Sequence, residues 1–307
     1  MFRIINKRII NPSEARRIVN RYYSTIEYID KCPVPKIDTG CTFCEPNLPM
    51  QNLTKQINNS KSYPWKHLIY LSNNSDYKKW PAKLEFSIGN DGPEGSVIGD
   101  LSRFKRDLLD PYHPVLISQS YIENKVDHGK DLRFLLYPDF KEIRINDYFS
   151  IEDEKERNEV LKNFIVKFLT PVGEIPDAEV NNLYKVKDYD KNLILTCGHY
   201  QRDIRCGKYA PLIIDEIKKT LEIENLQGST DVGVISHIGG HVFAGNVIIF
   251  KNMSQDIGEG GEEGDVCRVF KSGVWYGRVK PENVQGIVSE SIVNSRIIKE
   301  IYRGDVS

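Results

Sequence analysis

The sequence predicts an α/β (α+β) protein built from two halves of similar size. Short apolar runs of strand length alternate with amphipathic helical patterns in each half, as they do in folds that layer helices on a sheet. Residues 173–188 are polar and irregular, so we expect a boundary there that separates residues 26–180 from residues 181–307. The length of 307 residues exceeds the usual size of one domain and agrees with this division.

The first half is expected to be an αβ domain with at least three strands and a helix. Residues 67–73, 114–122 and 131–140 are short runs rich in aliphatic and aromatic side chains, which favour strands. Residues 151–169 carry acidic side chains early and lysines late, which suits the dipole of a helix. Pro171 ends this pattern, because proline cannot continue a helix.

The second half opens with a strand over residues 191–199 that contains Cys197 near its end. A helix is expected over residues 211–225, because proline is favoured in the first turn of a helix. Two strands around a glycine turn, a short strand and a closing helix are expected at residues 231–241, 242–250, 274–279 and 289–304. With a cysteine at the first strand-to-helix turn, this order is typical of a thioredoxin-like layered sheet-and-helix domain. We expect this C-terminal domain to pack with a related N-terminal αβ domain.

Residues 1–25 differ in composition from the rest of the chain. The first 24 residues contain six arginines and lysines, interspersed with apolar residues, and one acid, Glu14. Such Arg-rich, acid-poor, amphipathic leaders are typical of mitochondrial transit peptides, although an ordinary basic first helix would have the same composition. We therefore predict a mitochondrial protein, in the matrix, the intermembrane space or both.

The overall charge indicates few partners. A formal net charge of −1 gives no electrostatic case for binding nucleic acid. No apolar run approaches the roughly 20 residues that a membrane-spanning helix needs, so no membrane span is expected. The sequence does not fix the oligomeric state.

Two cysteines and two histidines form the pattern that carries the most chemistry. Eight residues separate Cys197 from Cys206, and three separate His237 from His241. Two thiolates and two imidazoles can bind zinc, or a [2Fe–2S] cluster in which histidines replace cysteines on one iron. The histidine spacing fits zinc, but the cysteine spacing is too wide for a usual zinc knuckle and suits a cluster loop. The alternative for each residue alone is a buried thiol or a hydrogen-bonded core histidine.

His199 is a reserve ligand. Cys197-Gly-His199 imitates half of a Rieske motif, in which cysteine and histidine alternate in two loops, but the sequence has no second C-x-x-H. We therefore rank His199 below His237 and His241.

Three segments resemble the sucrase/ferredoxin-like family, a group of fungal and plant thioredoxin-like ferredoxins: CGHYQRDIRCGKYAP, HIGGHVFAGN and WYGRVKPEN. The resemblance implies a [2Fe–2S] cluster of non-Rieske type, with Cys197 and Cys206 on one iron and His237 and His241 on the other. It further implies that Arg202, Asp203 and Arg205 supply loop structure or charge near the cluster. The matched residues that shape the loops would be Gly239, Gly240, Gly245 and Asn246, and Trp275, Gly277 and Pro281 match the last segment. Tyr200-Gln201 departs from the family pattern, which leaves the path of the first loop open.

A cluster of this kind would transfer one electron at a time. Neutral imidazoles in place of thiolates would raise its potential above the roughly −400 mV of all-cysteine ferredoxins. Because imidazoles titrate near neutral pH, electron transfer is expected to couple to proton transfer. We therefore expect an electron carrier or redox sensor with redox-protein partners, active in thiol redox quality control, more than an enzyme that turns over a substrate. A zinc-stabilised structural or interaction module with the same four ligands is the alternative.

Cys41-x-x-Cys44 is the remaining cysteine motif, with Cys32 nearby. It can be a redox pair, a zinc half-site or two loop thiols. A thioredoxin-like pair would follow a strand and open a helix, whereas this one lies in a turn-rich region, so loop thiols are favoured over a dithiol oxidoreductase. Cys267, beside Val266 and Val269, is expected to be a packing residue.

Overall fold

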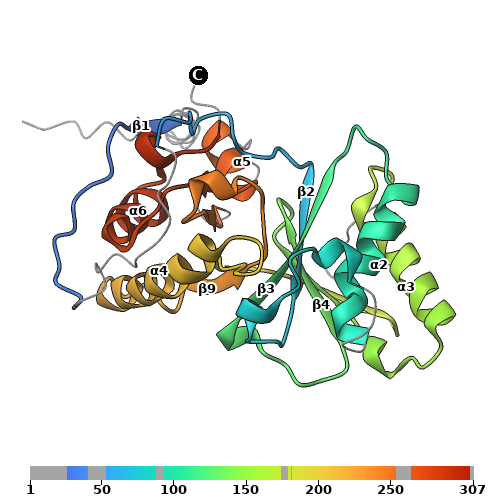
Figure 1. Ribbon diagram of the computed structural model, residues 1–307. Helices are drawn as coiled ribbons and strands as arrows, with labels where there is room; N and C mark the ends of the chain where they lie inside the picture. The colour runs from blue at the N-terminus through green and yellow to red at the C-terminus, as the bar shows by residue number, and fades with distance from the viewer. Residues whose placement is uncertain are drawn as a thin grey trace, which may run out of the picture.

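The computed structural model describes residues 26–40, 53–87, 93–173, 179–180, 182–253 and 264–304 (Figure 1). The predicted leader at residues 1–25 and both cysteines of Cys41-x-x-Cys44 lie outside the described residues.

Most strands of the described chain belong to one ten-stranded sheet with the order β11-β10-β8-β9-β3-β2-β4-β5-β7-β6. The first half supplies β2 (Lys66–Leu71), β3 (Val115–Ile122), β4 (Leu132–Tyr137), β5 (Lys141–Ile145) and β6 (Glu179–Val180). Strand β7 (Tyr184–Asp188) lies just beyond the expected boundary but pairs with β5 and β6 of the first half. The second half supplies β8 (Asn192–Cys197), β9 (Thr230–Ile235), β10 (Val247–Phe250) and β11 (Val274–Tyr276). A separate parallel pair joins β1 (Glu27–Ile29) to β12 (Arg296–Ile298).

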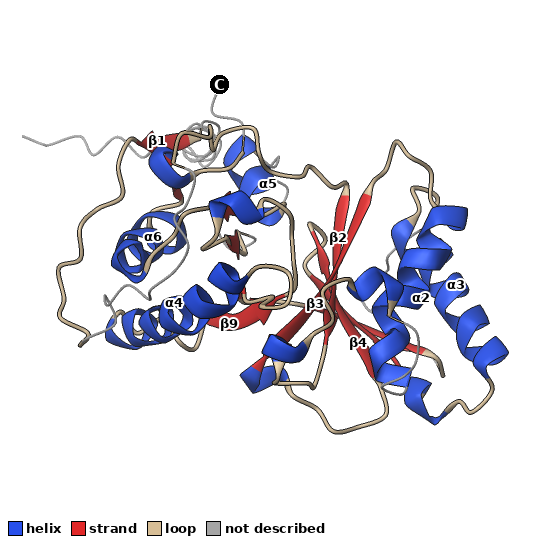
Figure 2. Cartoon of the chain, in the orientation of Figure 1, coloured by secondary structure: helices blue, strands red, loops and turns tan. Residues whose placement is uncertain are grey.

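The α-helices are α2 (Pro93–Leu108), α3 (Glu154–Leu169), α4 (Ile204–Ile223), α5 (Asp265–Lys271) and α6 (Val284–Ile287). The last continues as a π-helix over Val288–Val293. Short 3₁₀ turns occur at Tyr77–Lys79, Leu84–Phe86, Glu123–Lys125, Tyr148–Ser150, His241–Phe243, Pro281–Asn283 and Lys299–Ile301. The helices α2 and α3 cover the sheet of the first half, and α4 and α6 pack in the second half (Figures 1 and 2). Among the described residues, no helix combines the length and the apolar character that crossing a bilayer requires.

The two halves repeat one topology. In the first, β2 pairs with β3 in parallel across α2, β4 pairs antiparallel with β2, and β5 pairs with β4. In the second, β8 pairs with β9 in parallel across α4, β10 pairs antiparallel with β8, and β11 pairs with β10. The first half has the order β-α-β-β-β-α, and the second has the same strand pairing with α5 inserted between its last two strands, which confirms the predicted layered αβ architecture and the relation between the halves.

The halves are joined edge to edge. Strands β3 and β9 pair antiparallel, with Ser120 opposite Ile235 and Ile122 opposite Gly233, so the sheet crosses the expected boundary without a break. The division into residues 26–180 and 181–307 stays a prediction, because one sheet holds both parts.

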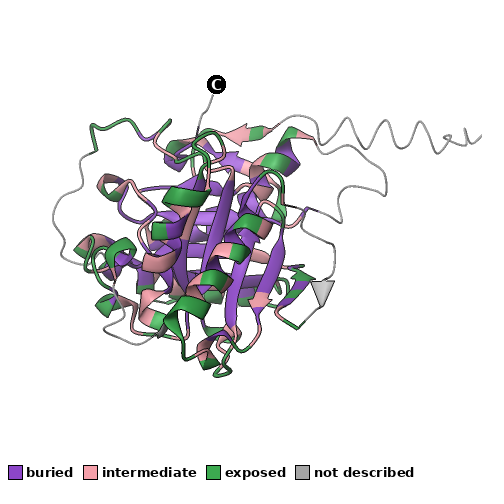
Figure 3. Cartoon of the chain, turned by 90° about the vertical axis from the view of Figure 1, so that its right-hand side faces the viewer, coloured by how far each residue is buried: buried purple, intermediate pink, exposed green. Residues whose placement is uncertain are grey.

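The described residues form three hydrophobic cores, because side chains along each strand point alternately to the two faces of the sheet. Successive strand residues point to opposite faces, so Leu68 packs under the first-half helices while Ile69 faces a central core. In the second half, Ile194 packs under the helices while Leu195 and Cys197 face the same central core. Strands β2, β4, β8 and β10 are buried on both faces, and Figure 3 shows how much of the sheet is buried. The central core lies between the two halves. The first cysteine of the predicted metal site therefore points into this central core.

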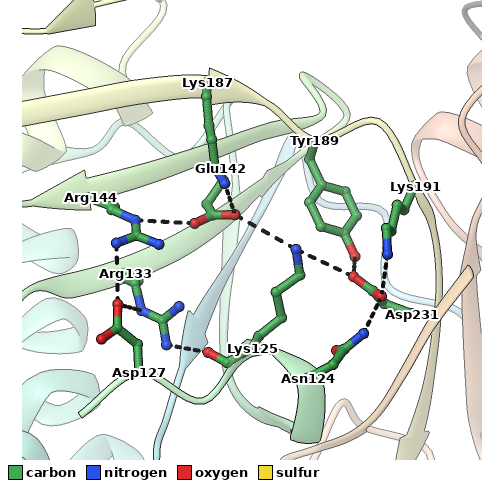
Figure 4. A network of polar contacts seen from close by, with 10 residues as sticks. All are labelled: Asn124, Lys125, Asp127, Arg133, Glu142, Arg144, Lys187, Tyr189, Lys191 and Asp231. Carbon is green, nitrogen blue, oxygen red and sulfur yellow. Dashed lines mark hydrogen bonds and ion pairs between the residues drawn. The ribbon is translucent and has the colours of Figure 1, made fainter. Parts of the chain in front are cut away.

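A buried polar network ties the sheet together away from the cysteines (Figure 4). Glu142 on β5 contacts Lys187 on β7 at 3.0 Å, and Asp231 on β9 accepts a 2.7 Å hydrogen bond from the hydroxyl of Tyr189. The Lys125 ammonium lies 3.9 Å from Glu142 and 3.4 Å from Asp231, so it bridges the two carboxylates. Because each buried carboxylate has a cation beside it, the network links strands of both halves without an unpaired charge.

Two helix predictions need correction. The helix expected over residues 211–225 begins seven residues earlier, since α4 spans Ile204–Ile223 with Pro211 inside it. Its start is set by Asp203, whose carboxylate accepts a 2.9 Å hydrogen bond from the backbone N–H of Arg205. The closing helix expected over 289–304 is also wrong: the π-helix ends at Val293, Ser295 adopts φ = 53° and turns the chain into β12, and only a short 3₁₀ turn follows at Lys299–Ile301.

Candidate metal centre

The two predicted cysteine ligands lie together in the central core. Cys197 is the last residue of β8 and Cys206 lies in the first turn of α4, and each is 1% exposed. The turn between them is fixed by backbone hydrogen bonds from Arg202 and Asp203 to the carbonyl of His199, both 3.1 Å. The spacing of eight residues thus returns the chain to the strand end, so that the two thiols, both free, hydrogen-bond to each other.

The histidine pair lies on the loop that follows β9. Gly239 and Gly240 adopt φ = 82° and 68°, in the left-handed region that glycine enters without steric cost. This turn brings the rings of His237 and His241 to a centroid separation of 6.0 Å. His237 is half-buried and His241 is exposed, so the pair forms a rim between the core and the surface.

The thiol pair interacts with the first histidine of the HIGGH loop, His237. The Cys197 thiol hydrogen-bonds to Cys206 and to the His237 side chain, and these contacts hold its pKa well below the usual range despite burial. The hydrogen bond to Cys197 and burial raise the pKa of Cys206. Two interacting thiols ionise one before the other, so the pair favours a single thiolate, which is the form of cysteine that binds metals.

Two thiols and two imidazoles are donors that both iron and zinc accept. Over the described residues, no three or more His, Cys, Asp or Glu side chains gather closely enough to hold one ion together.

His199 supports the histidine loop through its ring. Its Nδ1 accepts a 3.0 Å hydrogen bond from the backbone N–H of His237, which leaves the proton on Nε2 for donation to the carbonyl of Pro81 at 2.9 Å. Burial lowers the pKa of His199, in keeping with a neutral ring. Both ring nitrogens are therefore engaged with the backbone.

The Asp203–Arg205 pair connects the two ligand loops. The Arg205 guanidinium contacts the Asp203 carboxylate at 3.0 and 2.8 Å and donates a third hydrogen bond, 3.1 Å long, to the carbonyl of His241. Arg202 is exposed and lines a cavity of about 170 Å³ together with His237. Asp203 and Arg205 therefore position the two ligand loops, and Arg202 lines the cavity beside His237.

Arg303 is a site residue that sequence analysis missed. Its side chain is buried, and it donates to the Gly239 carbonyl at 3.2 Å and to Asn246 Oδ1 at 2.9 Å. Burial lowers its pKa to about 10, while the nearby Cys197 and Cys206 act to raise it. A Cβ at Gly240 would collide with the guanidinium, so the glycine leaves room for this cation. The second glycine of HIGGH was the available signal, although it does not say which side chain fills the space.

Tyr200, which departs from the family pattern, packs on α4. A Cβ at Gly207 would come within 2.5 Å of the Tyr200 ring, so glycine in the first helical turns makes room for the larger side chain. The larger side chain at Tyr200 therefore fits because residue 207 is a glycine.

The other described cysteines lie elsewhere. Cys267 on α5 is 2% exposed in the core of the second half, in keeping with a packing role. Cys32 donates from its thiol to the carbonyl of Asn283 at 3.4 Å, and burial raises its pKa to about 11. A thiol with a raised pKa is a poor nucleophile at neutral pH.

The comparisons with known proteins agree with the motifs. The family model described as sucrase/ferredoxin-like matches residues 57–304. The chain belongs to the sucrase/ferredoxin-like family. It is 37% identical to altered inheritance of mitochondria protein 32 of Debaryomyces hansenii over 94% of this chain and 99% of the relative. Proteins of the same name from Clavispora lusitaniae and Meyerozyma guilliermondii are 36% and 33% identical, each over 92% of this chain and 97% of the relative. No solved structure matches the chain.

Proposed function

We propose that this member of the sucrase/ferredoxin-like family is a [2Fe–2S] electron-transfer or redox-sensing protein of mitochondria. The observation that carries the proposal is the hydrogen-bonded thiol pair of Cys197 and Cys206 beneath the rim formed by His237 and His241. A two-iron cluster takes two ligands on each iron, and this donor set divides into one thiol pair and one imidazole pair. Such a cluster would supply one-electron chemistry when bound.

The proposed cysteine ligands are buried, whereas the proposed histidine ligands lie closer to the surface. Cys197 and Cys206 would be held in the apolar central core, while the exposed His241 would face solvent and redox-protein partners. An exposed imidazole can exchange a proton with water, which supports proton-coupled electron transfer. Arg303 places a fixed positive charge near both thiols and would offset the negative charge of thiolates and sulfides.

The cellular role rests on the relatives. Proteins of this similarity are named for altered inheritance of mitochondria, which supports a mitochondrial role. We infer a carrier or sensor in thiol redox quality control, with the matrix or intermembrane space as its compartment and residues 1–25 as its transit peptide.

The decisive experiment is the visible absorption spectrum of the purified full-length chain, with iron, acid-labile sulfide and zinc analysis. We expect a reddish-brown protein with two irons and two sulfides per chain. Cys197→Ala should lose the cluster, His237→Cys should retain it with a lower potential, and Cys267→Ala is the matched control for a buried thiol outside the site. A colourless protein with one zinc per chain would establish the zinc-stabilised module instead.

Two further measurements test finer points. A redox midpoint that does not change between about pH 6 and 10 would contradict solvent-exposed histidine ligation. Thiol-exchange activity that disappears in Cys44→Ala but persists in Cys197→Ala would favour the dithiol oxidoreductase.

A further inference from the structure

A second cavity lies between the two halves at the opposite end of β8 from Cys197. It has a volume of about 570 Å³, within the range of small-molecule sites. The first half contributes Trp65, Lys66, Pro138 and Asp139, and the second contributes Arg268, Lys271 and Ser272. Ser272 precedes β11, whose Val274 pairs with Ile249 on β10, and Ile249 pairs with Ile194 on β8. Ile194 lies three residues before Cys197, which is roughly 10 Å of strand.

One cation of the cavity wall is fixed in place. Lys66 is only 7% exposed, and its ammonium donates to the carbonyl of Phe168 at 3.0 Å and contacts Asp139 at 3.3 Å. A buried ammonium held by a carbonyl and a carboxylate loses little side-chain entropy when it meets an anion. Asp139 also keeps acceptor capacity for a hydroxyl or amino group, because a carboxylate has about four lone-pair sites.

The second half adds cations on α5. Arg268 contacts Asp265 at 3.8 Å, and both side chains are more than two-thirds exposed, so their ion pair contributes little in water and the guanidinium is available to a ligand. Lys271, at the end of the same helix, lines the same cavity. The wall therefore holds three cationic side chains and one carboxylate.

Flat apolar surface completes the wall. The half-buried indole of Trp65 is held by the Lys66 ammonium, 4.7 Å from its ring centroid, and by the His113 ring, which meets it at 74° with the ring centroids 4.9 Å apart. Pro138 lines the cavity beside it. An indole held in this way is a stacking surface for another aromatic ring.

We propose that this cavity binds a nucleotide, with the aromatic base against Trp65 and the phosphate at Arg268 and Lys271. Arg pairs with phosphate through two parallel hydrogen bonds, and Lys supplies a point charge, so together they select an anion of this type. The base explains the indole and proline, which a bare anion would not need. A bound nucleotide would contact both halves of the chain.

The test is isothermal titration calorimetry of the full-length protein with three probes: adenosine monophosphate, adenosine and ribose 5-phosphate. We expect saturable binding of adenosine monophosphate and at least about tenfold weaker binding of the two fragments, since each lacks one recognised group. Trp65→Leu and the Arg268→Gln/Lys271→Gln double variant should each weaken binding by a similar factor. Lys155→Gln, which removes an exposed cation of α3 outside the cavity, should leave it unchanged.

Equal binding of ribose 5-phosphate and adenosine monophosphate would overturn the nucleotide assignment and leave an anion site. Equal binding of adenosine would overturn the role of the cations, and absence of binding at millimolar concentration would overturn the site altogether. The visible spectrum is recorded on the same samples. Nucleotide binding does not depend on the cluster, so failure here and failure of the proposed function are separate results.

Discussion

The free energy of unfolding should fall in acid because His67, buried beside the central core, cannot take up a proton in the folded chain. Its ring is 2% exposed, lies 5.9 Å from Phe250 and 6.4 Å from Trp275, and shares a 2.9 Å hydrogen bond with the Ser118 hydroxyl. Burial lowers its pKa to about 3, with a further contribution from the positive charge of Lys61. The folded protein therefore holds this ring neutral over most of the acidic range.

The magnitude follows from the difference between the folded and unfolded pKa values of His67. In the unfolded chain the ring takes up a proton near its ordinary pKa of 6.5, whereas the folded chain resists until about pH 3. Between these values the unfolded state binds more protons, so the stability contributed by His67 is complete above pH 6.5 and is lost as the pH falls. The loss amounts to about 2 kcal/mol at pH 5 and about 3 kcal/mol at pH 4.

The measurement is urea unfolding of the wild type and of His67→Gln at intervals from about pH 4 to 8. Glutamine keeps a hydrogen-bonding partner for Ser118 but does not titrate, so the stability difference between the two proteins should shrink or reverse towards acid. His128→Gln, at an exposed position, is the matched control and should follow the wild type. Parallel stability curves for wild type and His67→Gln would refute the reasoning.

Three further predictions concern the loops of the site and the stability of the fold. Gly240→Ala should lose about 1–3 kcal/mol and disturb Arg303, whereas Gly239→Ala, with a similar φ but no atom near its Cβ, should lose less; equal unfolding midpoints would contradict this. Asp203→Ala removes the cap of α4 and should cost about 1 kcal/mol or more in urea unfolding. Burial lowers the pKa of Lys61 to about 8, so from pH 8 to 10.5 the unfolded chain keeps a proton that the folded chain loses. The stability of the wild type relative to Lys61→Met should therefore rise by about 3 kcal/mol over this range, and a constant difference between the two proteins would contradict this.

The sequence predicted the central strands well because their signal is local. Runs such as HLIYL around Leu68 are apolar on both faces, as a strand between two cores must be. Helix α2 was missed because it contains glycine and serine at positions that a helix usually fills with stronger formers. Gly99 is one of these, and a Cβ there would collide with the carbonyl of Ser87. Close packing against Ser87 therefore requires glycine at this position, and glycine lowers the helix propensity that the sequence shows.

In the site, too, residues close together in the sequence could be predicted, whereas a residue brought in by the fold could not. The four proposed ligands lie in two short motifs, so their spacing is visible along the chain. Arg303 lies 62 residues beyond His241 in the sequence and reaches Gly239 only through the fold. Pro211 was misleading for a related reason: proline usually opens a helix, but here the cap at Asp203 had already done so.

The antiparallel junction of β3 and β9 has a consequence for attempts to produce either half alone. Cutting the chain at the boundary would expose the backbone donors and acceptors of both strands, and unpaired edge strands are templates for association between chains. Because the halves share one topology, an isolated second half could pair its own β9 with β9 of another copy and rebuild a similar continuous sheet. The intact chain satisfies that edge within one molecule, so it should remain monomeric at this edge where its fragment would not.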